Sequence, residues 1–475
     1  MNFAHAAPEI FLTVAICVVL IVDVFLKEEQ RDVTYLLSML AIVGTAVVSA
    51  IFAVNGSVLA FNGSYVADPA SLVLKMTAYL AVAVVFLYSR NYLKAAGLFK
   101  GEFFVLGLFG LLGIMVMISA HNLLTMYLGL ELLSLSQYAL VAFNRDSSTS
   151  AESAMKYFVL GAIASGTLLY GISMLYGVTG TIDFTKLTQH LAALNGLSLP
   201  AVLGLVFVVV GIAFKFGAVP FHMWLPDVYQ GAPTPVTLYI GSAPKIAAFA
   251  LTWRILIDGL MPMQSSWQQM LIVLCVLSLA IGNIVAIVQT NIKRMLAYST
   301  ISHVGFILLG FIAGTEEGVR AAMFYTITYV PMAVGAFGMV ILLSRKGFEA
   351  ERLEDFKGLN SRSPWFALMM LMIMFSMAGV PPFVGFYAKL VVLGAVIDAH
   401  LTWLAAYGVL LAVVGAYYYL RVIWYMYFSD PIDEAPLTAP TDMRLVISAN
   451  GLGLLALGIF PGALLDLCAR VLGLG

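Results

Sequence analysis

Long apolar stretches separated by short polar intervals make up almost the whole chain. A helix that crosses the hydrocarbon core of a bilayer needs about 20 mostly apolar residues, and about 14 stretches meet that criterion. The longest polar interval, at about residues 344–363, is too short to form a soluble domain. The pattern therefore predicts an all-α polytopic membrane protein with one membrane domain over residues 1–475. The predicted spans are 8–26, 34–54, 70–89, 102–119, 122–143, 152–177, 199–217, 236–257, 266–288, 296–313, 318–343, 363–385, 402–428 and 443–470.

Composition agrees with a membrane protein. The chain is 62% hydrophobic and only 10% charged, whereas soluble domains carry about 25% charged residues. The first apolar run, in MNFAHAAPEIFLTVAICVVLIVDVFLK, has neither the preceding basic residue nor the small-residue cleavage site of a signal peptide. We therefore expect it to be a retained first helix.

Lysine and arginine are distributed unequally between the two sides of the predicted bundle. Because cytoplasmic loops carry the excess of basic residues, the intervals after odd-numbered spans are predicted to be cytoplasmic and both termini periplasmic. The opposite side holds little beyond Lys186, Arg320 and Arg470. The residues assigned to the cytoplasmic side are Lys27, Arg31, Arg90, Lys94, Lys100, Arg145, Lys293, Arg294, Arg345, Lys346, Arg352, Lys357, Arg362, Arg421 and Arg444.

The sequence offers no ligand set for a redox cofactor. Cys17, Cys275 and Cys468 are far apart in apolar segments, whereas iron–sulfur clusters and structural zinc need clustered thiolates. We find no spans with paired histidines for haem. We also predict no strands, and hence no glycine-rich nucleotide loop after one. The chain is expected to bind no cofactor of its own.

A few basic residues lie inside the predicted spans. Lys75 and Arg254 are near span ends, where a long side chain can reach the interface, and we expect both to do so. Lys215, Lys245 and Lys389 have apolar residues on both sides, and a lysine at a helix centre costs about 3 kcal/mol on insertion. Such a cost indicates function, and a structural ion pair is the alternative interpretation for each of the three.

Glu131, in MYLGLELLSLSQYAL, is the acidic residue placed deep in an apolar span. Its carboxylate would hold a nearby lysine protonated, whereas burial without that partner favours the neutral amine. Lys156 lies about one turn inside the cytoplasmic end of span 6, so anchoring and a role in the charge chain are both open. For His303 a core histidine and a proton relay are equally compatible with the sequence.

Two spans are broken by proline. Pro220 follows Lys215 in KFGAVPFHMWLPDVYQGAPTPV, and Pro381 and Pro382 precede Lys389 in SMAGVPPFVGFYAKL. Proline leaves backbone carbonyls without helical partners, so each break must face protein or a hydrated cavity. Paired broken helices in two halves of a chain indicate inverted repeats. We predict one repeat over residues 102–257 (spans 4–8) and a second over 266–428 (spans 9–13).

The first of these stretches, followed by the lysine in SAPKIAAFALTWR, resembles the signature of the proton-translocating antiporter-like subunits of respiratory complex I and of Mrp antiporters. NIKRMLAYSTISHVGF is similar to the matching segment of the second repeat. The forms GLELLSL, ISHVGF and AGVPPFVGFYAK look most like the subunit N branch of NADH:quinone oxidoreductase. The alternatives are an Mrp-type cation/proton antiporter subunit or the paralogous subunit M, which typically have a glutamate where this chain has Lys389. A structural membrane subunit without transport is a further class.

The resemblance implies a role for each buried group. Glu131 and Lys215 correspond to a gate set by the neighbouring subunit. Lys245 and Lys389 correspond to the connecting and terminal proton sites, and His303 falls near the bridge between two half-channels. Protons would cross from the cytoplasmic side through this central chain of lysines.

The resemblance also implies partners. The chain would be a translocase subunit with no redox centre, driven by electron transfer elsewhere in the complex. NADH, FMN, iron–sulfur clusters and quinone would bind partner subunits. The implied neighbours are subunit M and the small subunits K and J, in the lipid bilayer of a bacterial plasma (inner) membrane, with no nucleic-acid partner.

Overall fold

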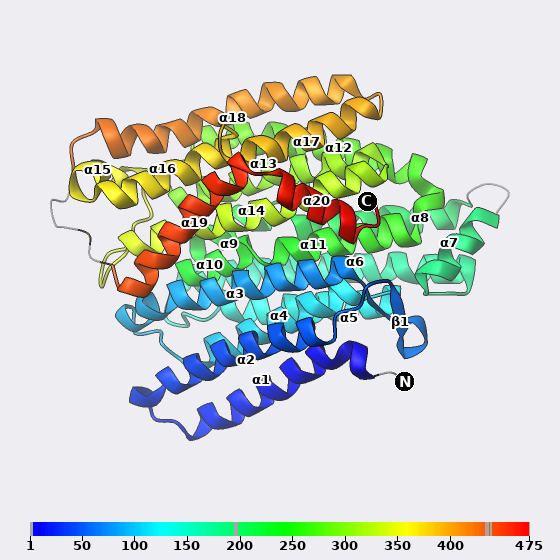
Figure 1. The fold of residues 1–475 in the computed structure, drawn as a ribbon, viewed down its shortest axis with the longest axis horizontal. Helices are drawn as coiled ribbons and strands as arrows, with labels where there is room; N and C mark the ends of the chain where they lie inside the picture. The colour runs from blue at the N-terminus through cyan, green and yellow to red at the C-terminus, as the bar shows by residue number, and fades with distance from the viewer. Residues whose placement is uncertain (1–2, 194–197, 433–436, 438, 475) are drawn as a thin grey trace.

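The computed structural model describes residues 3–193, 198–432, 437 and 439–474. Its long helices run side by side in one bundle, with α1 (Ala7–Phe25) beginning and α20 (Gly462–Val471) ending at the same end (Figure 1). We call this end the terminal face. The opposite end carries α15 (Leu359–Arg362) and the polar interval before it, and we call it the loop face.

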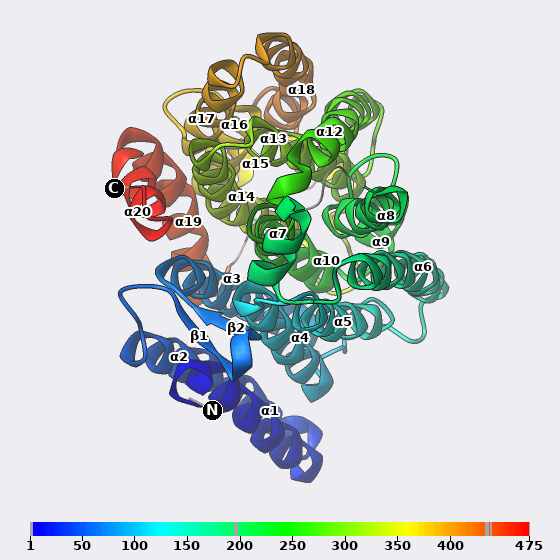
Figure 2. The same cartoon turned by 90° about the vertical axis from the view of Figure 1, so that its right-hand side faces the viewer.

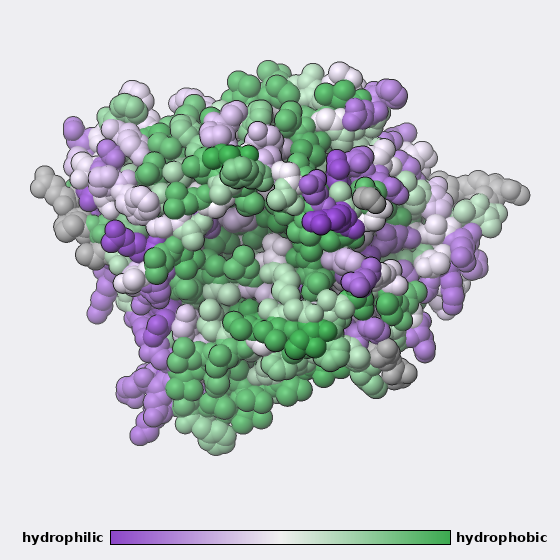
Figure 3. All heavy atoms as spheres, in the orientation of Figure 1, coloured by the Kyte–Doolittle hydropathy of each residue, from purple (hydrophilic) through white to green (hydrophobic). Residues whose placement is uncertain are grey.

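The surface of the bundle is that of a membrane protein. On the face shown in Figure 3, hydrophobic residues cover the middle of the bundle and hydrophilic residues gather toward its two ends. In the part of the chain that the structure describes, 13 helices are long and apolar enough to cross a membrane. The remaining predicted span, 363–385, is a broken helix formed by α16 (Pro364–Ala378) and α17 (Val384–Asp398). The prediction of a polytopic α-helical protein is confirmed.

The elements follow the predicted order along the chain. The N-terminal region contains α1, α2 (Asp32–Ile51), β1 (Val58–Ala60), β2 (Tyr65–Ala67) and α3 (Pro69–Ala95). The next region contains α4 (Gly101–Ser119), α5 (Leu123–Val141), α6 (Ser148–Thr179), α7 (Phe184–Ala193), α8 (Leu199–Phe216), α9 (Trp224–Gly231), α10 (Thr234–Gly241), α11 (Pro244–Thr252) and a π-helix (Trp253–Gly259). The last regions contain α12 (Gln264–Ile287), α13 (Ile292–Ala313), α14 (Glu316–Leu343), α15, α16, α17, α18 (Thr402–Phe428), α19 (Thr441–Ile459) and α20.

Four details of the sequence prediction were wrong. The chain does contain strands, because β1 and β2 form a small antiparallel hairpin between α2 and α3. The short helix α7 lies between the predicted spans 152–177 and 199–217, where no helix was predicted. The second broken span continues to Asp398 rather than ending at residue 385, because α17 resumes the helix after the prolines. The last span is divided into α19 and α20 at Pro461.

Two stretches of the bundle share the same close helix packing. A Cβ atom on Gly113 would lie 2.6 Å from the backbone N of Leu133, so α4 and α5 approach closely only because this residue is glycine. At an offset of 169 residues, a Cβ on Gly282 would lie 2.6 Å from the backbone N of Ser302 in the packing of α12 on α13.

The loops repeat the correspondence at opposite ends of the molecule. At the terminal face the N–H of Leu123 donates to the carbonyl of Ile182, at 2.9 Å. At the loop face the N–H of Ile292 donates to the carbonyl of Glu351, at 2.7 Å. Because the matching contacts lie at opposite faces, they support an inverted relation between the predicted repeats.

Both broken helices end in the same backbone motif. Gly217 closes α8 with a φ of 78°, and Gly379 closes α16 with a φ of 85°, a conformation that favours glycine. In each case two N–H groups turn back to carbonyls of the last helical turn, as in a Schellman motif. The next residues contain the prolines Pro220 and Pro382, each after a cis peptide bond. The predicted interruptions of both spans are therefore present.

The helices at the centre of the bundle are buried. Helices α10, α11, α13 and α14 are almost entirely buried, whereas most residues of α1, α6 and α19 are not buried. The view along the bundle places α1 and α2 at one margin and α18 at the opposite margin (Figure 2). The polar groups of the central helices are thus shielded from lipid by other helices.

Candidate functional site

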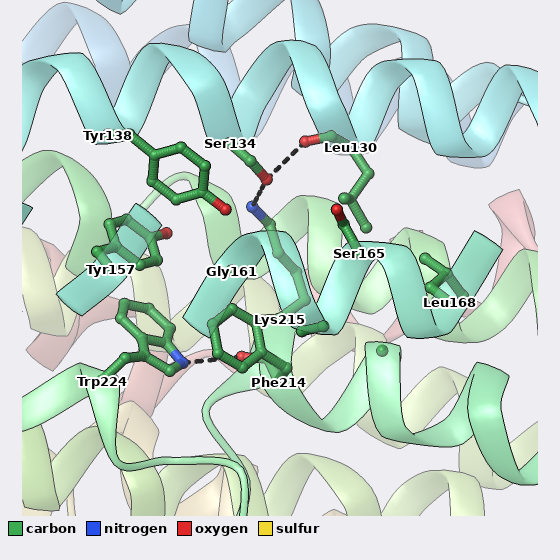
Figure 4. Close-up of a pocket in the computed structure, with 12 residues that line it drawn as sticks. Leu130, Ser134, Tyr138, Tyr157, Gly161, Ser165, Leu168, Phe214, Lys215 and Trp224 are labelled. Carbon is green, nitrogen blue, oxygen red and sulfur yellow. Dashed lines mark hydrogen bonds between the residues drawn. The ribbon is translucent and has the colours of Figure 1, made fainter. Parts of the chain in front are cut away.

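Lys215 lies on the last turn of α8, two residues before the capping glycine. Only 8% of the residue is exposed. Its ammonium donates to the hydroxyl of Ser134 at 3.2 Å and to Oε1 of Gln137 at 3.4 Å, both on α5. A small cavity beside it is lined by residues of α5, α6 and α8 and by Trp224 (Figure 4). Its volume of about 10 Å³ is close to that of a single water.

Glu131 lies one helical turn before Ser134 on α5. Within the described residues it forms no ion pair with Lys215, and its Oε1 is buried without a hydrogen-bond partner. The hydroxyl of Ser134, which donates to the carbonyl of Leu130 at 2.7 Å, receives the lysine instead (Figure 4). The expected direct contact between carboxylate and ammonium is therefore replaced by a neutral hydroxyl and an amide.

Lys245 lies on the first turn of α11, directly after the helix interruption at Ser242. It is 2% exposed, and its ammonium donates to the carbonyl of Phe216 at 2.8 Å. That carbonyl belongs to the C-terminal end of α8, where the helix dipole and the freed lone pairs both favour a cation. The structure therefore brings Lys245 to the residue that follows Lys215.

At the second break, Lys389 likewise donates to carbonyls at the end of a half-helix. It lies on α17, and its ammonium donates to the carbonyls of Met377 and Ala378 at 3.1 and 2.8 Å. These carbonyls end α16, so a lysine again occupies the negative end of a half-helix. Each break is predicted to face protein or a hydrated cavity, and at both breaks a buried lysine bonds carbonyls at the end of the first half-helix.

His303 is enclosed by tyrosine. The residue is 3% exposed on α13, and its two ring nitrogens lie 2.7 Å from the hydroxyl of Tyr325 and 3.0 Å from that of Tyr419. The Tyr419 hydroxyl also lies 2.5 Å from that of Ser299. An imidazole with hydroxyls on both nitrogens can accept a proton on one side and release one on the other.

Phe306 separates this group from Lys389. The Lys389 ammonium lies 5.2 Å from the centre of the Phe306 ring, and the Phe306 ring stacks on Tyr325 at 6.0 Å. His303 and Lys389 are thus neighbours in one region without a direct hydrogen bond between them.

Lys156 lies apart from the other lysines, at the loop face. Its exposed ammonium bonds Asp227 on α9 at 2.8 Å and Glu152 on its own helix at 2.9 Å. Arg294 on α13 reaches the other oxygen of Asp227 at 2.7 Å. These ion pairs join α6, α9 and α13, and they give Lys156 the structural partners that the anchoring interpretation requires.

Two basic residues that were expected to reach the interface do not. Lys75 is 4% exposed and pairs with Glu9 at 2.5 Å. Arg254 is 3% exposed and bonds Asp68 at 2.5 Å and Asp258 at 3.0 Å. An internal carboxylate was available to each, so burial with a partner replaced snorkelling.

Asp68 illustrates the electrostatics of these pairs. It caps α3, where its side chain accepts the N–H of Ser71. Burial alone would raise the pKa of Asp68, but Arg254 and the Ser71 N–H hold it below its usual value. The carboxylate therefore stays ionised near neutral pH, and the pair ties α3 to the π-helix that follows α11.

Sequence reasoning missed several polar residues of the site. Ser134 and Gln137 follow Glu131 at three-residue spacing, which places them on one face of α5. Tyr325 and Tyr329 are four residues apart on α14 and also share a face. Such helical spacing of polar side chains inside an apolar span is the signal that could have identified both sets. Tyr419 had no comparable signal, because several tyrosines adjoin it.

Comparison with known proteins gives consistent results. Residues 120–415 match the family described as NADH:quinone oxidoreductase/Mrp antiporter, TM. A protein of Thioalkalivibrio sulfidiphilus called NADH-quinone oxidoreductase subunit N is 58% identical over 467 residues, covering 98% of this chain and 97% of its own. A protein of Thiobacillus denitrificans with the same designation is 56% identical over 473 residues, covering 100% and 98%.

Solved structures show the same fold. A chain of respiratory complex I from Thermus thermophilus, solved with bound aureothin, has a TM-score of 0.82 and 30% identity, covering 97% of this chain and 98% of that one. A chain of the Mrp complex from Dietzia sp. DQ12-45-1b has a TM-score of 0.86 at 21% identity, covering 100% and 97%. The second likeness concerns the fold alone.

Proposed function

Because this chain belongs to the NADH:quinone oxidoreductase/Mrp antiporter family of membrane proteins, we propose that its buried lysines carry protons across the membrane within an NADH-quinone oxidoreductase. The chain is an antiporter-like membrane subunit of the type that its relatives call subunit N. Such a subunit takes part in a translocase reaction. The electrons and the redox groups, NADH, FMN, iron–sulfur clusters and quinone, are assigned to partner subunits.

One observation carries the assignment of the lysines. Lys245 and Lys389 are buried, and each donates to carbonyls at the end of a half-helix rather than to a carboxylate. A carbonyl can bond a neutral amine's N–H as well as an ammonium's, whereas a carboxylate would fix the charge. Lysines held in this way can lose and regain a proton without losing their position.

The proposed path links the two repeats, 102–257 and 266–428. A proton reaches Lys215 under the influence of Glu131, passes to Lys245 at the shared end of α8, and leaves by Lys389 in the second repeat. His303 and its tyrosines lie on the route to Lys389. Lys156 ranks below these residues as a proton-carrying site, because its ion pairs at the loop face support an anchoring role.

Orientation and partners are part of the proposal. The excess of basic residues supports a cytoplasmic loop face and a periplasmic terminal face in a bacterial inner membrane. The relatives' designation and the complex I match support other membrane subunits as neighbours. The proposed neighbours are subunit M and the small subunits K and J.

Replacing Lys215 by arginine tests the function. Arginine keeps the positive charge but holds its proton too firmly to release it, since its pKa lies above about 12. We expect Lys215→Arg to assemble and still to impair proton pumping in membrane vesicles, normalised to assembled complex. Lys215→Met should also impair pumping.

Wild-type pumping by the arginine variant would reduce Lys215 to a fixed charge. Sodium-dependent exchange without any electron-transfer partner would instead favour the Mrp-type antiporter alternative.

A further inference from the structure

A cavity outside the lysine sites opens at the loop face. Its volume is about 570 Å³, and it lies between the end of α3, the end of α14, the following turn and the start of α19. Polar side chains from α3 and from the turn line it, among them Asn91, Tyr92 and Glu349. This position places it where water on the loop side meets the polar interior of the bundle.

A tight turn directs Glu349 toward the helices. The backbones of Arg345 and Phe348 bond each other in both directions, at 2.9 and 2.8 Å, which reverses the chain just before Glu349. The Tyr92 hydroxyl then donates to Oε1 of Glu349, and the Thr234 hydroxyl donates to Oε2 at 3.2 Å. The residue is exposed along the cavity, while both of its carboxylate oxygens contact helices of the bundle.

The two other glutamates of the same loop are neutralised by lysines. Glu351 pairs with Lys293 of α13 at 2.6 Å, and Glu354 pairs with Lys357 at 2.9 Å. Among the described residues, Glu349 forms no such ion pair and is bonded only by hydroxyl groups. Among the glutamates of this loop, Glu349 is therefore the one whose charge no lysine balances in the described residues.

The surroundings of Glu349 favour protonation near neutral pH. Burial of the carboxylate and the nearby charge of Glu351 raise the pKa of Glu349 to about 7. The groups that face it are Tyr92 from α3, Glu351 with its partner Lys293, and the basic residues of the other arm of the turn, Arg345 and Lys346. A group with such a pKa exchanges protons readily at working pH.

The hydroxyl that contacts Glu349 leads into the bundle. Thr234 is fully buried and begins α10, and Lys245 lies eleven residues later on α11, after the interruption at Ser242. Buried hydroxyls continue beside these helices. The Tyr229 hydroxyl is buried without a partner among the described atoms, and those of Thr300 and Tyr329 lie 2.9 Å apart next to His303.

We propose that Glu349 is the proton-uptake carboxylate of this subunit. A hydronium ion in the cavity gives a proton to the carboxylate, which forms an O–H bond and leaves a water molecule. That O–H bond then breaks as the Thr234 oxygen takes the proton. The Thr234 hydroxyl gives its own proton to a water molecule on the inner side, and the carboxylate is restored. This inference rests on the proposed function, because uptake has a purpose only if the buried lysines translocate protons.

The test compares Glu349→Gln with Glu354→Gln in the assembled complex. Glu354 is a matched control, because it lies in the same loop and is also exposed but is paired with Lys357. Pumping is measured in inverted vesicles while the outer pH is varied from about 6 to about 9, across the range where a group of this kind titrates. We expect Glu349→Gln to pump about fivefold more slowly at the alkaline end, where a collecting group matters most, and to approach wild type at the acid end. Glu354→Gln should follow the wild-type profile, and Glu349→Asp should restore part of the rate.

A second variant keeps the carboxylate and changes its hydrogen bond. The Tyr92 hydroxyl stabilises the charged form of Glu349, so Tyr92→Phe should raise its pKa and shift the pumping profile to higher pH. This readout also decides the matter if Glu349→Gln does not assemble.

Lys215→Arg, measured in parallel, separates this inference from the function beneath it. If Lys215→Arg is impaired while Glu349→Gln matches wild type at every pH, the uptake role is wrong and the function stands. If both pump normally, the proposed function fails. An equal loss at all pH values in Glu349→Gln, without a shift in Tyr92→Phe, would mean that the residue only holds the loop.

Discussion

In the break between α8 and α9, the buried lysine stands two residues before the capping Gly217, whereas in the break between α16 and α17 it follows Gly379 by ten residues. The backbone is the same in both, with a left-handed glycine and two N–H groups returned to the last turn. The charged side chain is thus on the first arm of one break, Lys215, and on the second arm of the other, Lys389.

The carbonyls that the breaks expose explain this difference. At the second break, Lys389 reaches back from α17 to the end of α16 and bonds two carbonyls itself. At the first break the bond to the Phe216 carbonyl comes from Lys245, on another helix. The physical requirement is a cation at the negative end of each half-helix. Which helix supplies it is free to differ, and Lys215 is thereby available for contact with α5.

The position ten residues after the capping glycine shows what the first repeat has in place of Lys389. Asp227 stands there, at the loop face, and is shared by Lys156 and Arg294. The second arm of the first break is therefore fixed by ion pairs at the rim. The second arm of the second break is fixed by a buried lysine, so its attachment and its proton site are one group.

The largest expected effect follows from that dual role. Lys389→Met removes the proton site and also leaves two carbonyls unpaired, a cost of about 1–3 kcal/mol for each buried group. We expect it to abolish most proton pumping and to lower the yield of assembled complex. Vesicle pumping and the amount of assembled complex are measured together.

The control for losing a buried lysine as such is Lys75→Met with Glu9→Gln. This pair lies outside the two repeats, between α1 and α3. The double variant should pump at the wild-type rate per assembled complex. A wild-type rate in Lys389→Met would show that the second break carries no proton.

A smaller effect is expected in the histidine region of the second repeat. Tyr419→Phe removes a hydroxyl that contacts His303 and Ser299. We expect pumping to slow by about tenfold, below the usual contribution of a positioned proton-transfer group. Tyr418→Phe is the matched control, because the neighbouring hydroxyl donates to Asn283 at 3.1 Å instead. Equal rates in the two variants would leave His303 as a core histidine.

The comparison also shows what the sequence could predict. Apolar length predicts the spans, since only helices satisfy their backbone in a bilayer, and the prolines predicted both breaks. The partners of Lys215, Lys245 and Lys389 could not be predicted, because they depend on which helix ends meet in space. The prediction that Lys75 and Arg254 reach the membrane interface was wrong for a related reason. Snorkelling is the expectation for a lone helix, but α1 and α3 supplied the carboxylates of Glu9 and Asp68 within the bundle.

The smallest expected effect concerns the contact between α5 and the first break. The sequence predicted that the Glu131 carboxylate pairs with Lys215. In the structure the Ser134 hydroxyl takes that place and accepts a hydrogen bond from the Lys215 ammonium at 3.2 Å. Ser134→Ala removes one of the two hydrogen bonds that the Lys215 ammonium donates. A hydrogen bond to a charged group is worth about 1.5–3 kcal/mol, and Gln137 offsets part of the loss because it still accepts from Lys215. We expect a severalfold slower rate of pumping with normal assembly.

Ser136→Ala serves as the control for this measurement, because its hydroxyl donates to the carbonyl of Leu132 on its own helix. If Ser134→Ala pumps as fast as Ser136→Ala, the hydroxyl is a spectator. Glu131 would then act on Lys215 through its charge alone, without a bonded intermediary. If Ser134→Ala instead stops pumping altogether, the hydroxyl is an obligatory step between the two charged groups. The first break would then depend on one side chain as strongly as the second depends on Lys389.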